Sequence, residues 1–140
     1  MENQAMETRP TKQVIIIRRD LKMRRGKEIA QACHASMGVF TKYAEFTSDP
    51  FTDVKFLICP IVTASKVWLE SSFAKICVYV ESEHALIDLE AQAEAAAIPH
   101  CLIEDNGKTE FAGVKTKTAL AIGPWWSEDI DKITGKLPLY

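Results

Sequence analysis

Val14-Ile15-Ile16-Ile17 is a run of four β-branched residues that no polar side chain interrupts. A run of this kind predicts a short strand covered on both faces, as in a sheet that lies between two layers of helices. The polar segment Asp20-Leu21-Lys22-Met23-Arg24-Arg25-Gly26-Lys27 follows it. We predict a helix that begins at Gly26, near the end of this segment, and runs to about residue 43. The fold is therefore expected to begin as a strand, a basic turn and a helix.

The rest of the chain alternates between strand and helix patterns. Strands are predicted at residues 56–59, 74–80, 101–103 and 116–122, the last ending at Gly123-Pro124. Short helices are predicted after a cap at Thr63 or Ser65, after a cap at Ser82 with Leu86, Leu89 and Ala93 on one face, and after a cap at Ser127. Residues 47–50 are rich in turn formers. This order predicts an α/β fold, a three-layer α-β-α single domain with a mixed sheet of about four strands.

The composition is typical of one globular domain, since the 140 residues are 47% hydrophobic. Residues 1–11 are polar and lack periodicity, so we predict a disordered N-terminal arm before a domain at residues 12–140. The longest uncharged apolar stretches, residues 14–17 and 56–62, are too short to span a membrane, and the N-terminus lacks a signal peptide's apolar core. We therefore expect a cytoplasmic protein without a membrane partner.

Four cysteines are well separated and mostly lie in apolar runs: Cys33, Cys59, Cys77 and Cys101. This distribution predicts buried, reduced thiols and no disulfide. The histidines next to Cys33 and Cys101 do not give the spacing of a zinc site. Because adjacent helical residues point about 100° apart, a catalytic pair of Cys33 and His34 is not expected either. No metal site is predicted.

The helix predicted from residue 26 has two contrasting faces. Apolar residues recur at helical spacing on a stripe that is expected to face the sheet: Ile29, Cys33, Met37, Phe40 and Ala44. The opposite stripe holds Lys27, Gln31, His34 and Gly38. These polar groups are therefore expected to share a site, although a structural or loop-bonding role is the alternative for His34.

Charge is segregated along a chain whose net charge is −2. Between positions 12 and 28 the only acidic residues are Asp20 and Glu28. The same stretch holds seven basic residues: Lys12, Arg18, Arg19, Lys22, Arg24, Arg25 and Lys27. The turn from Arg24 to Lys27 opens a helix, where free backbone N–H groups attract phosphate and basic side chains add charge-assisted contacts. It predicts a site for phosphate or an RNA backbone, with a solvated basic turn as the alternative. The turn lacks the full P-loop pattern, so nucleotide hydrolysis is unsupported.

The loop Glu104-Asp105-Asn106-Gly107-Lys108-Thr109 follows a predicted strand. It offers a carboxylate, an amine and a hydroxyl, groups that can position water beside a phosphate ligand. A simple turn that bonds its own backbone is the alternative. Thr116 and Thr118 alternate to one face of the next strand, where they can serve simply as β-formers.

Several of these segments together resemble a known family. Asp20-Leu21-Lys22-Met23, Gly26-Lys27, Ala30-Gln31 and His34-Ala35 are similar to the signature of the type II peptidyl-tRNA hydrolases, the archaeal and eukaryotic kind. Later blocks of the family are matched in order by Leu102-Ile103, Asp105, Gly107, Thr109, residues 116–118, 120–124 and 130–135. The resemblance covers the chain except for the N-terminal arm and residues 47–72.

The resemblance implies a three-layer α/β domain, commonly a homodimer, that hydrolyses the ester between peptide and tRNA in peptidyl-tRNA without a metal or organic cofactor. It implies four catalytic residues: Lys27, Asp105, Thr109 and Thr116. Substrate-binding residues are expected at Lys22, Arg24, Arg25, Gln31, His34 and Lys108. In this hypothesis Asp105 orients or deprotonates the water, Lys27 balances charge on the oxyanion or a phosphate, and the threonines supply hydrogen bonds.

The chain also departs from the family's pattern. Arg24-Arg25 stands where Gly-Lys is usual, Asn106 and Lys108 replace a common Ala and Arg, and the loop at 111–115 is one residue longer and lacks its proline. An arginine at position 24 adds bulk to the turn that faces substrate. The alternatives are a non-catalytic relative that binds RNA or a protein partner, and a hydrolase of another acylated substrate.

Overall fold

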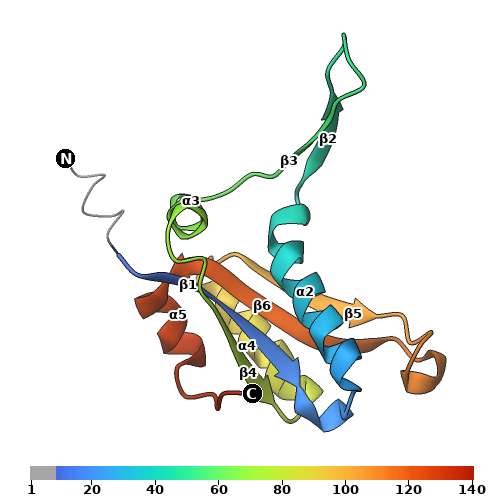
Figure 1. Ribbon diagram of the computed structural model, residues 1–140. Helices are drawn as coiled ribbons and strands as arrows, with labels where there is room; N and C mark the ends of the chain where they lie inside the picture. The colour runs from blue at the N-terminus through green and yellow to red at the C-terminus, as the bar shows by residue number, and fades with distance from the viewer. Residues whose placement is uncertain (1–8) are drawn as a thin grey trace.

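The computed structural model describes residues 9–140 and is built on a four-stranded mixed sheet (Figure 1). The strand order is β4-β1-β6-β5, with β1 at Thr11–Arg18, β4 at Lys75–Val80, β5 at His100–Asp105 and β6 at Thr116–Trp126. Strand β1 runs parallel to β4 and antiparallel to β6, which is antiparallel to β5. The predicted mixed sheet of about four strands is confirmed.

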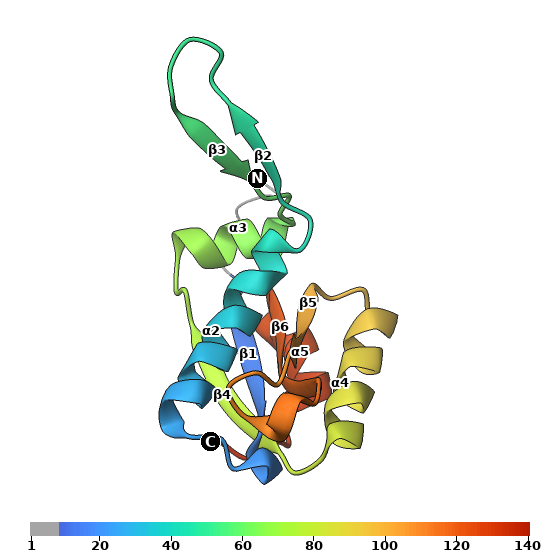
Figure 2. The same cartoon turned by 90° about the vertical axis from the view of Figure 1, so that its right-hand side faces the viewer.

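Helices cover both faces of this sheet, as Figures 1 and 2 show. Val14 and Ile16 of β1 pack in one core with α4 (Glu83–Ala95) and α5 (Ser127–Thr134), whereas Ile15 and Ile17 pack in a second core under α2 (Arg25–Thr41). Because side chains alternate along a strand, an unbroken apolar run supplies both cores. The predicted three-layer α-β-α domain is thus present. Helix α3 (Thr63–Glu70) lies beside the C-terminal end of α2, where the rings of Phe40 and Trp68 stack with centroids 6.0 Å apart.

The predicted helix starts are correct for α4 and wrong for two other helices. The Ser82 hydroxyl accepts the Ala85 N–H at 3.0 Å, and Leu86, Leu89 and Ala93 are buried as expected. Helices α3 and α5 begin after Val62 and Trp126 instead, without a side-chain cap. Tertiary contacts replace the caps: the buried Ser65 hydroxyl donates to the Pro124 carbonyl, and the Ser127 N–H donates to the Pro10 carbonyl at 2.9 Å.

Strand β6 does not end at Gly123-Pro124 as predicted. It continues to Trp126, which pairs with Thr11 of β1, and the Gly123 N–H donates to the Pro99 carbonyl at 2.7 Å. Pairing with β1 and this long-range bond keep the chain extended beyond the proline.

The predicted orientation of the apolar stripe on α2 is wrong. Ile29 and Met37 are 59% and 63% exposed, whereas Gln31 and Ala35 are buried against the sheet. Gly38 lies so close to β5 that an added Cβ would be 2.6 Å from the Cys101 Sγ. The helix therefore approaches the sheet through its small residues, while Ile29 and Met37 of the predicted stripe remain outside.

The prediction of four buried cysteines is also wrong. Cys33 lies on the outer face of α2 and Cys77 on the edge strand β4, and both are exposed. Cys59 and Cys101 are partly buried, and all four are free thiols. The exposure of Cys33 follows from the same reversed orientation of α2.

A separate two-stranded sheet extends beyond the C-terminal end of α2. It pairs β2 (Glu45–Ser48) with β3 (Lys55–Ile58), and every residue of both strands is exposed. The strand predicted at 56–59 is present as β3, but it lies outside the main sheet. Its partner β2 was not predicted, and the last two residues of β2 fall in the stretch at 47–50 that was expected to turn. Figures 1 and 2 show this hairpin projecting from the body of the domain.

The two ends of the described chain pack on the domain. Arg9 lies over the Trp126 ring, 4.4 Å from its centroid, and Thr11 already belongs to β1, whereas residues 1–8 of the predicted N-terminal arm lie outside the described residues. At the other end the Tyr140 hydroxyl donates to the Glu28 carboxylate, which raises the pKa of Tyr140 to about 12. Within residues 9–140 no helix is sufficiently long and apolar to cross a membrane.

Candidate active site

Three side chains from two distant parts of the sequence meet at the N-terminal end of α2. The Lys27 ammonium group, in the first turn of α2, donates to Asp105 Oδ1 at 2.8 Å and to Thr109 Oγ1 at 2.6 Å. Asp105 is the last residue of β5, and Thr109 lies in the loop after it. The Lys27 and Asp105 side chains are only 14% and 11% exposed, so the pair is partly shielded from water.

Asp105 is held as a carboxylate by its surroundings. The hydrogen bond from Lys27 is the main cause that lowers the pKa of Asp105 below its ordinary value, partial burial opposes it, and the Gly107 N–H, 2.9 Å from Oδ2, lowers it further. The charge of Lys27 and the electrostatic effect of His34 act in the same direction. Stabilisation by donors therefore exceeds the cost of desolvation.

The loop that carries Thr109 is closed by a glycine. Gly107 has a φ of +80°, and an added Cβ would lie 2.4 Å from the Val114 carbonyl oxygen. The Gly113 N–H donates back to the Gly107 carbonyl at 2.9 Å. Only glycine fits this left-handed and crowded position, which folds the loop so that Thr109 faces Lys27.

Thr116 and Gln31 are near this cluster but have other partners. Thr116 pairs with Asp105 in the β5–β6 ladder, and its hydroxyl donates to the Val114 carbonyl at 2.9 Å. Gln31 is 3% exposed and accepts the Thr118 hydroxyl at 2.5 Å. The structure thus places Gln31 inside the contact between α2 and β6, one turn along the helix from Lys27.

An open depression of about 390 Å³ reaches the cluster from solvent. It is lined by Arg24, Gly26, Lys27, Thr109 and Glu110. The Arg24 Nε donates to Glu110 Oε1 at 2.9 Å, while the Arg24 side chain remains 81% exposed. Glu110 therefore partly neutralises the arginine that departs from the family's pattern.

The basic segment before α2 is less uniformly basic in space than along the sequence. Arg18 pairs with Asp20, Arg19 with Glu81, and Lys12 with Asp131. Three predicted binding residues are exposed and have no carboxylate partner among residues 9–140: Lys22, Arg25 and Lys108. His34, also predicted, is exposed on α2.

Sequence reasoning missed two residues that shape the site, Glu110 and Thr118. Thr118 had a usable signal, since its alternation with Thr116 placed both on one face of the strand. Glu110 had none, because its partner Arg24 is 86 positions away. Across residues 9–140 no three His, Cys, Asp or Glu side chains are placed to share a metal ion.

The fold and the site together define an α/β domain whose polar centre, made of an ammonium, a carboxylate and hydroxyl groups, suits the hydrolysis of an acyl bond. The chain belongs to the peptidyl-tRNA hydrolase PTH2 family, whose model matches residues 11–140. This match includes residues 47–72, where the sequence motifs alone showed little resemblance.

Relatives from archaea and animals agree with this assignment. A peptidyl-tRNA hydrolase of Methanothermobacter thermautotrophicus is 40% identical over 91% of this chain and 98% of its own length, and one of Methanopyrus kandleri is 36% identical over 91% and 97%. A probable peptidyl-tRNA hydrolase 2 of Drosophila melanogaster is 37% identical over 91% of this chain, which spans 61% of that protein. A solved protein of unknown function from Agrobacterium tumefaciens shares the fold, with a TM-score of 0.55 at 14% identity, and the match covers 93% of this chain and 97% of that one.

Proposed function

We propose that this chain hydrolyses the ester between peptide and tRNA in peptidyl-tRNA and that Lys27, Asp105 and Thr109 form its catalytic centre. The observation that carries the proposal is the three-residue cluster itself, in which one ammonium group joins a carboxylate and a hydroxyl beside an open depression that Lys27 and Thr109 line. Membership of the PTH2 family supports the substrate. The oxygen of water adds to the ester carbonyl and the bond to the ribose oxygen breaks. The proton that the water gives up balances the proton that the ribose oxygen takes up, so the products are the free peptide acid and the free tRNA hydroxyl.

Asp105 is suited to orienting the attacking water. Its lowered pKa keeps it ionised at neutral pH and makes it a weak base. A carboxylate has about four lone-pair sites. The bonds from Lys27 and Gly107 use one site on each oxygen. The remaining sites can accept an O–H of water and fix its direction, so Asp105 serves in alignment more than in proton removal.

Lys27 and Thr109 are suited to stabilising the oxygen atoms of the reacting ester. An ammonium group has three donors, and two of the Lys27 donors are used. The third is available for the developing oxyanion, where a fixed positive charge in a partly dry site is effective. Because Thr109 accepts its bond from Lys27, its own hydroxyl hydrogen is free to donate to the substrate. Thr116, whose hydrogen is given to Val114, can accept from the substrate.

The remaining proposed residues bind or position. Lys22, Arg25 and Lys108 are exposed cations that can contact tRNA phosphates, together with Arg24 at the rim of the depression. Gln31 holds α2 against β6 through Thr118 and so positions Lys27. His34 lies near enough to act electrostatically on Asp105.

We also propose that the chain works in the cytoplasm, where ribosomes generate peptidyl-tRNA, and that it forms a homodimer. The large exposed apolar surface outside the site supports the homodimer.

The test is release of tRNA. Purified chain is incubated with peptidyl-tRNA, and free tRNA is followed on acid gels beside a blank without protein. Release above the blank is the expected result. Binding of the RNA without release would instead identify the chain as a non-catalytic relative. Assay of a second acylated RNA, such as aminoacyl-tRNA, distinguishes the proposed substrate from another ester, because peptidyl-tRNA should react faster.

A further inference from the structure

Within residues 9–140, the strands of the hairpin at residues 43–62 contact each other and make few contacts with the other helices and strands. Its strands β2 and β3 bond to each other through four residue pairs, Glu45–Ile58 to Ser48–Lys55, and no residue of either strand is buried. It rises from the C-terminal end of α2, well away from the sheet (Figures 1 and 2). An isolated two-stranded hairpin is marginally stable in water, so this one is expected to gain from a partner.

The hairpin is apolar where a free surface element would be polar. Phe51 at its tip is 94% exposed and Phe46 is 84% exposed. Other large apolar side chains in the same segment are at least 41% exposed: Tyr43, Val54, Phe56, Leu57, Ile58, Ile61 and Val62. Exposed apolar surface of this extent marks an interaction site in soluble proteins.

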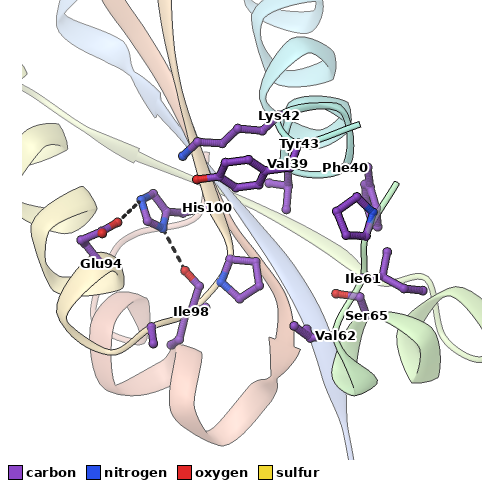
Figure 3. Close-up of a pocket in the computed structure, with 13 residues that line it drawn as sticks. Val39, Phe40, Lys42, Tyr43, Ile61, Val62, Ser65, Glu94, Ile98 and His100 are labelled. Carbon is purple, nitrogen blue, oxygen red and sulfur yellow. Dashed lines mark hydrogen bonds and ion pairs between the residues drawn. The ribbon is translucent and has the colours of Figure 1, made fainter. Parts of the chain in front are cut away.

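A cavity of about 430 Å³ lies at the base of the hairpin, and we call it the root cavity. Figure 3 shows Lys42, Tyr43 and His100 together on one side of it and Ile61 and Val62 on the other. Further walls come from the end of α2 and the turn before β5. The volume falls within the roughly 300–1,000 Å³ of sites that accept an organic group.

The root cavity is distinct from the candidate active site. It lies at the C-terminal end of α2 and the start of β5, whereas Lys27 and Asp105 lie at their opposite ends. Helix α2 spans about 22 Å between positions 27 and 42, at 1.5 Å per residue. The two sites are therefore separated by nearly the length of helix α2.

We infer that two copies of this chain associate through their hairpins, which lie side by side in opposite directions so that Phe51 of each copy enters the root cavity of the other. The inference rests on the homodimer proposed above and specifies its interface. At about 3.3 Å per extended residue, the chain from residue 44 to residue 51 places the tip at most about 23 Å from the root, and the same limit applies in both copies. Because the tip and the cavity belong to one chain, a twofold axis satisfies both contacts at once and closes the assembly as a dimer.

Area and charge both favour a second copy as the partner. At about 200 Å² for an aromatic side chain, Phe46, Phe51 and Phe56 alone expose roughly 450 Å² per copy, more than half of the ~800 Å² that each partner gives to a standard interface. Asp49 lies at the tip, where Asp53 pairs with Lys55 of the same hairpin at 2.9 Å. At the root, Lys42 has no carboxylate partner among residues 9–140, and Glu94, which also lines the cavity, lies 3.1 Å from His100. Opposed hairpins bring Asp49 to the end of the partner that holds Lys42.

The first experiment measures mass by light scattering and sedimentation over a range of protein concentrations. The wild-type chain should approach twice its 15.7 kDa mass. Phe51→Asp should weaken the dimer at least about tenfold, as expected for an aromatic anchor at the centre of an interface. Met37→Glu changes an equally apolar, exposed residue on α2 outside the hairpin and should leave the dimer intact. Circular dichroism checks that both variants fold.

The second experiment traps the predicted contact directly. In a background with Cys33, Cys59, Cys77 and Cys101 replaced by serine, a Phe51→Cys chain is mixed with a Val62→Cys chain that carries a size tag, and the mixture is oxidised. A disulfide between the two chains of different size is expected. A mixture of Phe51→Cys with Met37→Cys is the matched control and should give little product.

The outcomes separate this inference from the proposals it rests on. A wild-type chain that stays monomeric overturns both the homodimer and the hairpin contact and leaves the hydrolase proposal untouched. A dimer that Phe51→Asp does not weaken, or a mixture that fails to cross-link, retains the homodimer and overturns the hairpin contact. Hydrolysis by Phe51→Asp should equal the wild-type rate, because the Lys27 centre lies wholly within one chain.

Discussion

The two ends of helix α2 present opposite kinds of surface. At its N-terminal end two basic side chains have partners within the chain: Lys27 contacts Asp105 and Thr109, and Arg24 contacts Glu110. At its C-terminal end the chain continues into a hairpin whose apolar side chains are exposed. Buried polar groups need partners that are fixed in place, whereas exposed apolar groups are stabilised by a second surface. The first end is therefore organised for chemistry within one copy and the second for association.

The largest effect, on the rate of tRNA release, is expected from substitutions in the polar cluster at the N-terminal end of α2. Lys27→Ala removes the donor shared by Asp105 and Thr109, and Asp105→Ala removes the carboxylate that orients water. Each should lower the rate of tRNA release by about 10²- to 10⁴-fold, the usual range for loss of an acid–base or oxyanion-stabilising group.

Lys132→Ala is the matched control for these two variants. Lys132 lies on α5, across the sheet from the site, and within residues 9–140 its ion-pair partner is Asp129 of the same helix at 3.4 Å. It should retain the wild-type rate of tRNA release. If Lys27→Ala and Asp105→Ala also retained that rate, the assignment of the catalytic centre would be wrong even though the activity stood.

The second prediction concerns the body of α2, which joins the two ends. Gly38→Ala places a Cβ 2.6 Å from the Cys101 Sγ and should lower the free energy of unfolding by about 1–3 kcal/mol, as overpacking does. Gly26→Ala in the same helix meets nothing within 4 Å and should be neutral or stabilising by up to about 1 kcal/mol. Urea unfolding followed by circular dichroism measures both values.

A double variant identifies the cause of the Gly38→Ala effect. Cys101→Ala removes the crowded sulfur atom, so it should recover much of the stability that Gly38→Ala loses. An equal loss with and without the sulfur would show that helix α2 does not approach β5 in the way described.

The third prediction tests whether the unpaired cations of the basic segment contribute more to tRNA binding than those that pair with a carboxylate. Lys22→Ala or Arg25→Ala should weaken tRNA binding several-fold and reduce the slope of log affinity against log salt by about one unit each. Arg19→Ala should change the slope less, because Glu81 already neutralises this arginine. Filter binding of tRNA between low and physiological salt gives the slopes. Equal slopes for all three variants would contradict the division.

Much of the fold was predictable where local and tertiary signals agree. The β-branched run at 14–17 forms the doubly covered strand β1, and Ser82 caps α4, whose Leu86, Leu89 and Ala93 are buried. The orientation of α2 was not predictable from periodicity. The helix approaches the sheet through Ala35 and Gly38, and Gln31 is buried because Thr118 satisfies it, so the larger apolar stripe faces outward.

The candidate site was predictable only in part. The resemblance gave Lys27, Asp105 and Thr109, and the structure brings their side chains together across about 80 positions of sequence, as the separations of 78 and 82 show. It could not give the pairing of Arg24 with Glu110, because no pattern links residues on unrelated elements. Strand β2 of the hairpin was missed for a related reason, since an exposed strand has no buried face to reveal it.

The smallest effect is expected in the dependence of stability on pH, and it tests whether Asp105 is held as an anion. Since the pKa of Asp105 is lower in the folded chain than in the unfolded chain, the unfolded chain binds the proton more readily as pH falls. The stabilisation from Asp105 is therefore complete above the ordinary value of about 3.9 and is lost as pH falls through the lower folded value. Asp105→Asn cannot titrate, so its free energy of unfolding should fall less steeply than that of the wild type between about pH 5 and pH 2. Urea unfolding at a series of pH values measures the two curves. Parallel curves would mean that the pKa of Asp105 is not lowered. That result would contradict the proposal that Asp105 orients water rather than removes its proton.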